Sequence, residues 1–362
     1  HHGDSSKTIY ELIKESKYTQ RFAKLVDEHD GIKALLSDTE KKNHTLFVPT
    51  DRAFEHIPPH REPPPKEFIL ALLKYHIVPG RYPVGRVLAS HTIPTELASR
   101  ALGDRPQRLR VGLTLFGVHL NFYSKVVATD IVAKNGIIHA VGAILVPPPP
   151  QSKLIRLLPG RFSTLSLALE TTGLGEELDK VKEHATGGTV FAPTNHAFAR
   201  LGRRANAFLF SEHGKKYLRA LLRYHVVANE TLYSDAYYKR KDDDGEDNDD
   251  DANTELSSSD TDYWHVDLPS LLGDKAIHID VRRWKRFISI IINGHVRVSV
   301  QDGVARDGVI QVVDSVLIPP HKHHDHDHDG HDGGDDDDDS DKDSNGGISV
   351  DELRARLGPY VD

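Results

Sequence analysis

Apolar residues along the chain recur with two periods, one typical of amphipathic helices and one typical of buried strands. Residues 45–48 have the β-branched and aromatic content of a buried strand, and Pro49 cannot donate to a central ladder. Asp51 can cap a helix that continues into residues 53–54. The pattern therefore predicts a strand, a sharp turn and a helix start. Upstream, a break near residues 18–19 separates two predicted helices, whose apolar faces contain Ile9, Leu12, Ile13, Phe22, Leu25 and Val26.

Three phrases of this pattern occur twice, in the same order. TLFVPTDRAF at 45–54 returns as TVFAPTNHAF at 189–198, LLKYHIV at 72–78 as LLRYHVV at 221–227, and NGIIHAV at 135–141 as DGVIQVV at 307–313. Because the three motifs occur in the same order and with similar spacing, the sequence predicts two tandem copies of one module. The offset grows from 149 residues at Tyr75/Tyr224 to 172 at Gly136/Gly308, so the second copy carries 23 extra residues, in its acidic stretch.

The remaining pattern predicts further short strands and helices in each copy. Prolines make residues 56–66 a loop before a helix at 67–75. Strands are predicted in the first copy at 109–111, 118–123, 125–130, 136–140 and 142–146. In the second copy, helices are predicted around 165–169 and 215–224, and strands at 277–281, 286–292, 296–300 and 309–313.

At the three repeated phrases the chain resembles the fasciclin-like (FAS1) domain family, in tandem, over about residues 4–320. The resemblance implies an α+β fold in which each domain is a small β-sandwich or wedge with helices along one edge. It also implies a role outside the cell in adhesion and matrix contact, and it implies no catalytic mechanism. The second copy departs from the pattern, since it has Asn195 where the first has Asp51 and Gln311 where the first has His139.

Composition then divides the chain. We expect a first domain at 4–148, a proline-rich hinge at 149–152, a second domain at 153–320 with an acidic loop insertion at 239–262, a His/Asp-rich flexible tail at 321–340, and a calcium loop with a short helix at 341–358. Four consecutive prolines, residues 147–150, favour a stiff spacer that restricts the mutual orientation of the domains. The insertion has too few apolar side chains to offset its ordering entropy, so it should be a mobile loop.

Charge and residue counts exclude several classes of chemistry. The net charge of -8 is concentrated in acidic runs at 242–251 and 335–343, so it indicates no nucleic-acid partner. The chain has no cysteine, which removes disulfides and thiolate sites, and no methionine, which indicates a processed or trimmed product. No apolar run approaches the ~20 residues that span a bilayer, so no transmembrane segment is expected.

The sharpest local motif is the sequence DKDSNGGISVDE at 341–352, which fits the twelve-residue EF-hand calcium loop. Ligand positions would be filled by Asp341, Asp343 and Asn345, by the carbonyl of Gly347 and by Glu352. Gly346 supplies the turn, and residues 353–357 could form the exiting helix. The acidic segment before it cannot form an apolar entering helix, so the alternative is a disordered acidic tail.

Histidines offer two further metal hypotheses. His323, His324, His326 and His328 could capture zinc or copper weakly, or could belong to a solvated tail. If His1 is a genuine processed terminus, its amine and imidazole could hold copper with another histidine, resembling the histidine brace of copper oxygenases. A tag remnant explains the same His1–His2 pair. No organic cofactor is expected.

His76 and His225 each follow a tyrosine, and one hypothesis is that these histidines are catalytic, with Asp51 orienting the imidazole. We prefer a structural role, in which the imidazoles satisfy buried polar groups, because Asn195 can keep a hydrogen bond but cannot act as a base. No nucleophile elbow, phosphate loop or H-E-x-x-H motif is present, so no catalytic residue is assigned.

Two surface features point to extracellular binding. Asn43 and Asn229 begin N-glycosylation sequons. Arg282, Arg283, Trp284 and Arg286 interleave an aromatic ring with cations and could bind an acidic glycan, although a solvated hairpin tip explains them too.

The sequence as a whole predicts a secreted or cell-surface adhesion protein. Its partner would be extracellular matrix, cell-wall glycan or another protein, and self-association is left open. The alternative is a secreted enzyme acting on cell-wall polysaccharide or lignin-linked carbohydrate through a histidine or N-terminal copper site.

Overall fold

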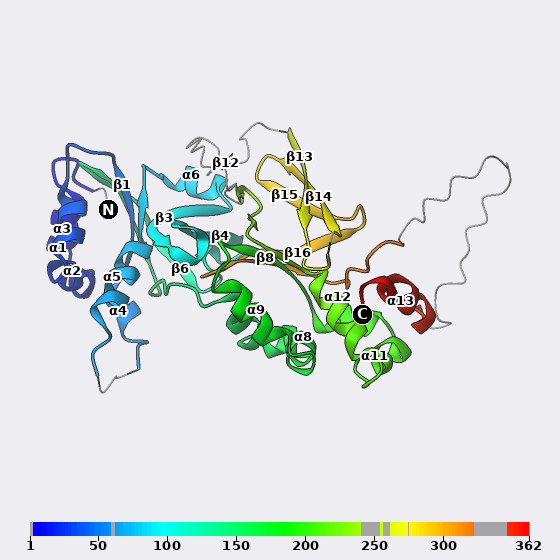
Figure 1. Cartoon of the computed structure of the whole chain (residues 1–362). Helices are drawn as coiled ribbons and strands as arrows, with labels where there is room; N and C mark the ends of the chain where they lie inside the picture. Colours follow the sequence, from blue (N-terminus) through cyan, green and yellow to red (C-terminus); the bar gives the residue numbers. More distant parts are fainter. Residues whose placement is uncertain are drawn as a thin grey trace.

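A computed structural model of the chain describes residues 3–58, 62–239, 254–255, 261–273, 275–321 and 346–361. It contains two modules of mixed α and β structure, which confirms the predicted fold class (Figure 1). Among the described residues each module has one curled sheet of seven strands, with helices packed beside it.

The helices of the first module are α1 (Ile9–Glu15), α2 (Gln20–Asp27), α3 (Asp30–Ser37), α4 (Asp51–Phe54), α5 (Lys66–Tyr75), α6 (Val84–Ala89) and the short 3₁₀ turn η1 (Arg100–Leu102). Its strands are β1 (His44–Pro49), β2 (Ile77–Pro79), β3 (Thr92–Ser99), β4 (Arg105–Thr114), β5 (Gly117–Leu120), β6 (Ser124–Ala133) and β7 (Gly136–Val141). The sheet order is β2-β1-β7-β6-β5-β4-β3. Strand β1 therefore pairs in parallel with the last strand, β7.

The helices of the second module are α7 (Gln151–Arg156), α8 (Pro159–Thr171), α9 (Leu174–Lys182), α10 (Asn195–Arg200), α11 (Arg203–Leu209) and α12 (Lys215–Arg223), followed near the C-terminus by α13 (Val350–Leu357) and η3 (Gly358–Tyr360). Its main sheet contains β8 (Gly188–Pro193), β9 (Val226–Ala228), β13 (Thr261–Pro269), β14 (Ala276–Trp284), β15 (Phe287–Ile292), β16 (Val296–Ala305) and β17 (Gly308–Val313). A small sheet joins β10 (Thr231–Leu232), β11 (Ala236–Tyr238) and β12 (Thr254–Glu255).

Read from the edge strand β9, the main sheet of the second module has the order β9-β8-β17-β16-β15-β14-β13, which matches the first sheet strand for strand. The predicted duplication therefore extends to topology. Strand β8 pairs in parallel with β17, as β1 does with β7. Every residue of these four strands is buried. The core of each module is therefore built on its central parallel pair.

Several boundaries differ from those predicted from sequence. Residues 142–146 do not form a strand, because β7 ends at Val141 and the chain then runs irregularly into the prolines. Strand β3 and helix α6 were not predicted. In the hinge at 149–152 the last two residues already belong to α7. Strand β12 and the start of β13 fall inside the predicted loop at 239–262, whose residues 240–253 and 256–260 lie outside the described part of the chain.

Direct contacts between the modules hold them together. An apolar cluster combines Leu102 of the first module with Tyr233, Tyr238 and Val304 of the second. Around it, Gln107 Nε2 donates to the carbonyl of Arg306 at 2.8 Å. These contacts, together with the proline spacer, restrict the mutual orientation of the modules.

A buried ionic network lies at the centre of this interface. Asp235 of the second module accepts hydrogen bonds from His91 N at 2.8 Å, Thr92 N at 2.9 Å and the Thr92 hydroxyl. The buried Arg108 donates from Nε to the same hydroxyl at 2.7 Å. Asp302 lies nearby, and burial followed by the negative charge of Asp235 raises the pKa of Asp302. The second module thus meets the first through a charged network rather than a purely apolar surface.

The C-terminal helix α13 packs on the second module beside α11 and α12 (Figure 1). Leu353 and Leu357 are fully buried in that module's core. Ahead of the helix, Ile348 N donates to the carbonyl of Leu201 at 3.1 Å. The chain therefore returns to the second module after residues 322–345, which lie outside the description. Within the described residues, no helix is long and apolar enough to cross a membrane.

We predict that Asp235→Ala destabilises the whole protein by about 2–4 kcal/mol, because it leaves buried donors of the first module without an acceptor. Relief of the repulsion between Asp235 and Asp302 offsets part of this loss. Urea unfolding followed by fluorescence measures the change. The exposed Glu212→Ala is the control and should shift stability by less than about 0.5 kcal/mol. Equal stability of the two variants would show that the modules do not depend on this network.

Candidate binding face on the second module

The outward surface of β13, β14 and β15 gathers side chains that the fold does not need for its core. Along these strands alternate residues are buried, and the intervening ones point away from the core. We call this surface the outer face; its members are Tyr263, His265, Asp267, His278, Asp280, Arg282, Trp284 and Phe287. Cross-strand register places Tyr263 opposite Arg282, His265 opposite Asp280, Asp267 opposite His278, and Trp284 opposite Phe287.

One end of the outer face is aromatic and cationic. Tyr263, Trp284 and Phe287 are 60%, 57% and 60% exposed, which is unusual for large apolar side chains. The rings of Trp284 and Phe287 stack with centroids 6.2 Å apart, and the guanidinium of Arg282 lies over Tyr263. These three rings line an open groove together with Arg282 and Arg297. Flat rings beside cations offer a surface for a sugar polymer with negative charges.

The four residues predicted here from sequence have different roles. Arg282 and Trp284 belong to the outer face. Arg286 lies in the hairpin turn, with its guanidinium over Phe287. Arg283 instead donates to the carbonyl of Ala89 in the first module at 2.9 Å, so it anchors the hairpin.

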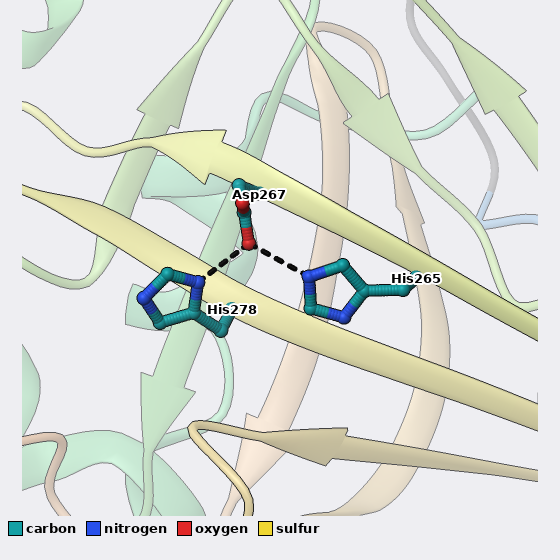
Figure 2. Close-up of side chains that lie close together, drawn as sticks. All are labelled: His265, Asp267 and His278. Carbon is teal, nitrogen blue, oxygen red and sulfur yellow. Dashed lines mark hydrogen bonds and ion pairs between the residues drawn. The ribbon is translucent and has the colours of Figure 1, made fainter.

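The other end of the outer face holds His265, Asp267 and His278 (Figure 2), with Asp280 beside His265. Asp267 Oδ1 lies 2.9 Å from His265 Nε2 and 2.5 Å from His278 Nδ1. The opposite nitrogen of His265, Nδ1, lies 2.8 Å from Asp280 Oδ1. Tyr263 donates its hydroxyl proton to the same Asp280 oxygen.

These pairings set the charge state of the His–Asp end. The hydrogen bond to Asp280, and then that to Asp267, raises the pKa of His265. The pKa of Asp267 is lowered first by its bond to His278, and that of Asp280 first by its bond to Tyr263. Because His265, Asp267 and His278 are exposed and Asp280 is only half-buried, their ion pairs add little to stability.

Part of the matching surface of the first module contacts the second module. His278 corresponds to Arg110, since each donates its backbone N–H to the turn asparagine of the hairpin, Asn293 or Asn121. Arg110 Nε donates to the carbonyl of Gln301 in the second module at 2.8 Å. At this position the sheet surface thus contacts the other module in the first copy, whereas His278 in the second copy is exposed.

His76 and His225 lie inside their modules, 0% and 2% exposed. In each, Nδ1 donates to the carbonyl four residues earlier, and Nε2 accepts the amide N–H of Leu145 or Leu317. His225 borders a small apolar cavity beneath α9. Since both nitrogens of each ring are hydrogen-bonded, neither imidazole is available to take a proton from a substrate.

The prediction that Asp51 caps its own helix is wrong, because Thr50 occupies the N-cap position of α4. Its Oδ1 instead accepts Arg21 N at 2.8 Å, in the first turn of α2. Asn195 Oδ1 likewise accepts Thr164 N at 2.9 Å, after a kink within α8. The shared requirement is an acceptor oxygen, which explains why aspartate and asparagine alternate between the copies.

The remaining predicted residues are distributed around the molecule. Asn43 is exposed, whereas Asn229 Oδ1 accepts the amide N–H of Thr186. Glu352 is nearly buried in the first turn of α13, where its carboxylate contacts Arg356 and His321. The other predicted side-chain ligands lie outside the described residues: Asp341, Asp343, Asn345, His323, His324, His326 and His328, as does His1.

The His–Asp cluster was missed from sequence, although a signal for it exists. The tripeptides HVD at 265–267 and HID at 278–280 are the same H-x-D pattern on two successive strands. Only the antiparallel register brings the two patterns opposite each other.

Comparison with known proteins adds the following. The family model described as the fasciclin domain matches residues 11–147 and 160–319. Aurofusarin biosynthesis cluster protein S of Gibberella zeae is 30% identical over 99% of this chain and 88% of its own length. Transforming growth factor-beta-induced protein ig-h3 of Sus scrofa is 26% identical over 88% of this chain, but the chain spans only 38% of that protein. A solved FAS1 domain pair from the insect cell adhesion molecule fasciclin I is 17% identical, covering 83% of this chain and 96% of that one, with a TM-score of 0.38.

Burial makes the two interior histidines acid-sensitive. It lowers the pKa of His76 and of His225 from the ordinary 6.5 to about 4, because the charged ring loses its hydration. The unfolded chain therefore binds more protons between these values, so stability is fully present above pH 6.5 and declines as the pH falls towards 4. On going from pH 7.5 to pH 5, each histidine should lower the free energy of unfolding by about 2 kcal/mol.

We predict that His76→Gln/His225→Gln flattens this dependence, since glutamine can donate and accept as His does without titrating. Urea unfolding at pH 7.5 and pH 5 measures it. The exposed His213→Gln should keep the wild-type slope. An unchanged slope in the double variant would assign the acid sensitivity to other groups.

Proposed function

The chain belongs to the fasciclin family, and on that premise we propose that it is an extracellular adhesion protein that binds an acidic polysaccharide through its outer face. Family members include extracellular adhesion proteins, which supports the location and the general role. The observation that carries the specific proposal is the exposure of Tyr263, Trp284 and Phe287 beside arginines on one sheet surface.

The chemistry of this surface suits a charged sugar polymer. Aromatic faces pack against the apolar faces of sugar rings, and guanidinium groups pair with carboxylates or sulfates. Arg282 and Arg297 lie along the same groove as Trp284 and Phe287, so the two kinds of contact can be made by neighbouring sugar units. The face is rigid, because its strands are hydrogen-bonded on a buried core, and so little entropy is lost on binding.

We predict that Trp284→Ala/Phe287→Ala weakens binding to immobilised polygalacturonate or heparin by at least tenfold, about 1.4 kcal/mol. Surface plasmon resonance at two salt concentrations measures this, and wild-type affinity should fall as salt rises. Phe116→Ala, which removes an exposed ring from the corresponding hairpin of the first module, is the matched control. Binding that survives the double variant would move the site elsewhere. Retention of matrix proteins but no polysaccharide would favour a protein partner.

A second candidate is a role in a biosynthetic pathway. It is favoured by the relative named for aurofusarin biosynthesis, which matches 99% of this chain. Failure of the purified chain to retain any polymer, together with loss of a pathway product from cells lacking it, would favour this candidate. The alternative of a polysaccharide enzyme gains no support from the interior histidines, whose ring nitrogens are hydrogen-bonded within the protein.

We propose an extracellular location, and also metal binding by the histidines of the C-terminal tail. Asn43, which is exposed beside β1, is the more accessible of the two sequons and suits secretion. Zinc or copper capture by His323, His324, His326 and His328 stays a prediction from composition.

We further propose that residues 341–352 bind calcium. The described half of the loop supports this, because Gly346 has φ +84° at the position where the motif needs a sharp turn. The amide of Ile348 bonds to Leu201, and Glu352 follows in the first turn of α13. Calcium would draw the carboxylate of Glu352 away from Arg356 and His321, so affinity should be weak.

We predict one saturable calcium site by calorimetry, and its loss in Glu352→Gln. Asp351→Asn is the control, because that exposed residue holds no ligand position in the motif. Thermal unfolding without calcium checks that Glu352→Gln has not displaced the helix. Absence of heat in the wild-type chain would remove this proposal.

A further inference from the structure

At the His–Asp end of the outer face, His265 and His278 both point toward Asp267 (Figure 2). His265 Nε2, His278 Nδ1 and a carboxylate oxygen of Asp267 all lie within 4.8 Å of one another. The two imidazole nitrogens converge on the same atom, Asp267 Oδ1. From this geometry we propose that His265, His278 and Asp267 form a binding site for a divalent transition-metal ion, Zn²⁺ or Cu²⁺.

The proton arrangement of the cluster supports a metal. His265 Nδ1 donates to Asp280, so Nε2 needs a second proton to bond Asp267. His278 Nδ1 also needs a proton to bond the same oxygen. A metal ion between the three side chains would replace both protons. It would bind the lone pairs of the two neutral imidazoles and the negatively charged carboxylate oxygen.

Asp280 and Tyr263 hold the His265 ring in place through its other nitrogen, Nδ1. A histidine that binds a metal commonly donates its other ring N–H to a carboxylate, which fixes the orientation of the ring. Asp280 does this for His265 at 2.8 Å, and Tyr263 donates to Asp280 in turn. Asp280 is therefore a positioning residue rather than a ligand.

The distances can reach metal coordination with small side-chain movements. In a tetrahedral site with bonds of about 2.1 Å, neighbouring donor atoms lie roughly 3.4 Å apart. The observed separations from Asp267 Oδ1, 2.9 and 2.5 Å, must widen by less than about 1 Å. The side chains are exposed, so nothing packed has to move, while the paired strands hold the backbone positions.

The donor set selects the class of ion. Two imidazoles with one carboxylate suit zinc and copper, whereas calcium and magnesium prefer oxygen ligands alone. Three protein ligands leave at least one coordination position towards solvent, where water or a carboxylate of a partner can bind.

The test must separate this site from the other histidines of the chain. We therefore use the full chain with His1, His2, His323, His324, His326, His328 and His331 changed to Asn, and titrate it with Zn²⁺ alone by calorimetry. We expect one site. His265→Asn/His278→Asn should abolish zinc binding. Asp267→Asn should weaken zinc affinity by at least about tenfold, because loss of a ligand lowers affinity at least as much as loss of a residue that only orients a ligand. Asp280→Asn should weaken it by about tenfold.

His295→Asn, which changes an exposed histidine of the β15–β16 turn, is the matched control and should keep full affinity. In the unaltered chain, Zn²⁺ should protect His265 and His278 from diethylpyrocarbonate while His213 and His295 still react, as read by mass spectrometry. The proposal is overturned if the background chain binds no zinc, or if the double variant binds it as well as the control. Circular dichroism confirms folding of each variant.

Discussion

The parallel pairing of an early strand with the last strand is the constraint on which each module depends. Strands β1 and β7, and likewise β8 and β17, are buried along their whole length. Close approach is built into the sequence, because a Cβ at Gly136 would lie 1.8 Å from the carbonyl oxygen of His44, and one at Gly308 would lie 2.1 Å from that of Gly188. Any other residue would push the two strands apart. The helices pack on this pair, so the rest of each module depends on it.

The duplication acts as a natural substitution experiment on the polar groups around that pair. His139 accepts the amide N–H of Asp130 and bonds the carbonyl of Tyr82, and Gln311 makes the same two contacts with Asp302 and Leu232. An imidazole and an amide are interchangeable there because each supplies one donor and one acceptor. The differences between the copies therefore mark positions where hydrogen-bonding capacity matters and proton transfer does not.

Much of the fold could be predicted from local pattern, since buried strands and proline-bent turns have strong local signatures. Strand β3 was missed because Pro94 and Glu96 interrupt its apolar alternation, and its stability comes from β4 and from the second module. The role of Asp51 was misassigned for a related reason. Its partner, Arg21, is 30 residues away, and a cap supplied from another helix has no local signal. The His–Asp cluster depends on strand register, which tripeptides on separate strands do not encode.

The two copies share one architecture but differ in the role of one part of the sheet surface. In the first module the outward side of β3 and β4 carries Arg108 and Arg110, which bond into the second module. In the second module the position of Arg110 is taken by His278, among side chains whose ion pairs add little to folding. A surface relieved of the interface is free to change without loss of stability. Its exposed rings, arginines and converging histidines are the observations on which the proposed binding role rests.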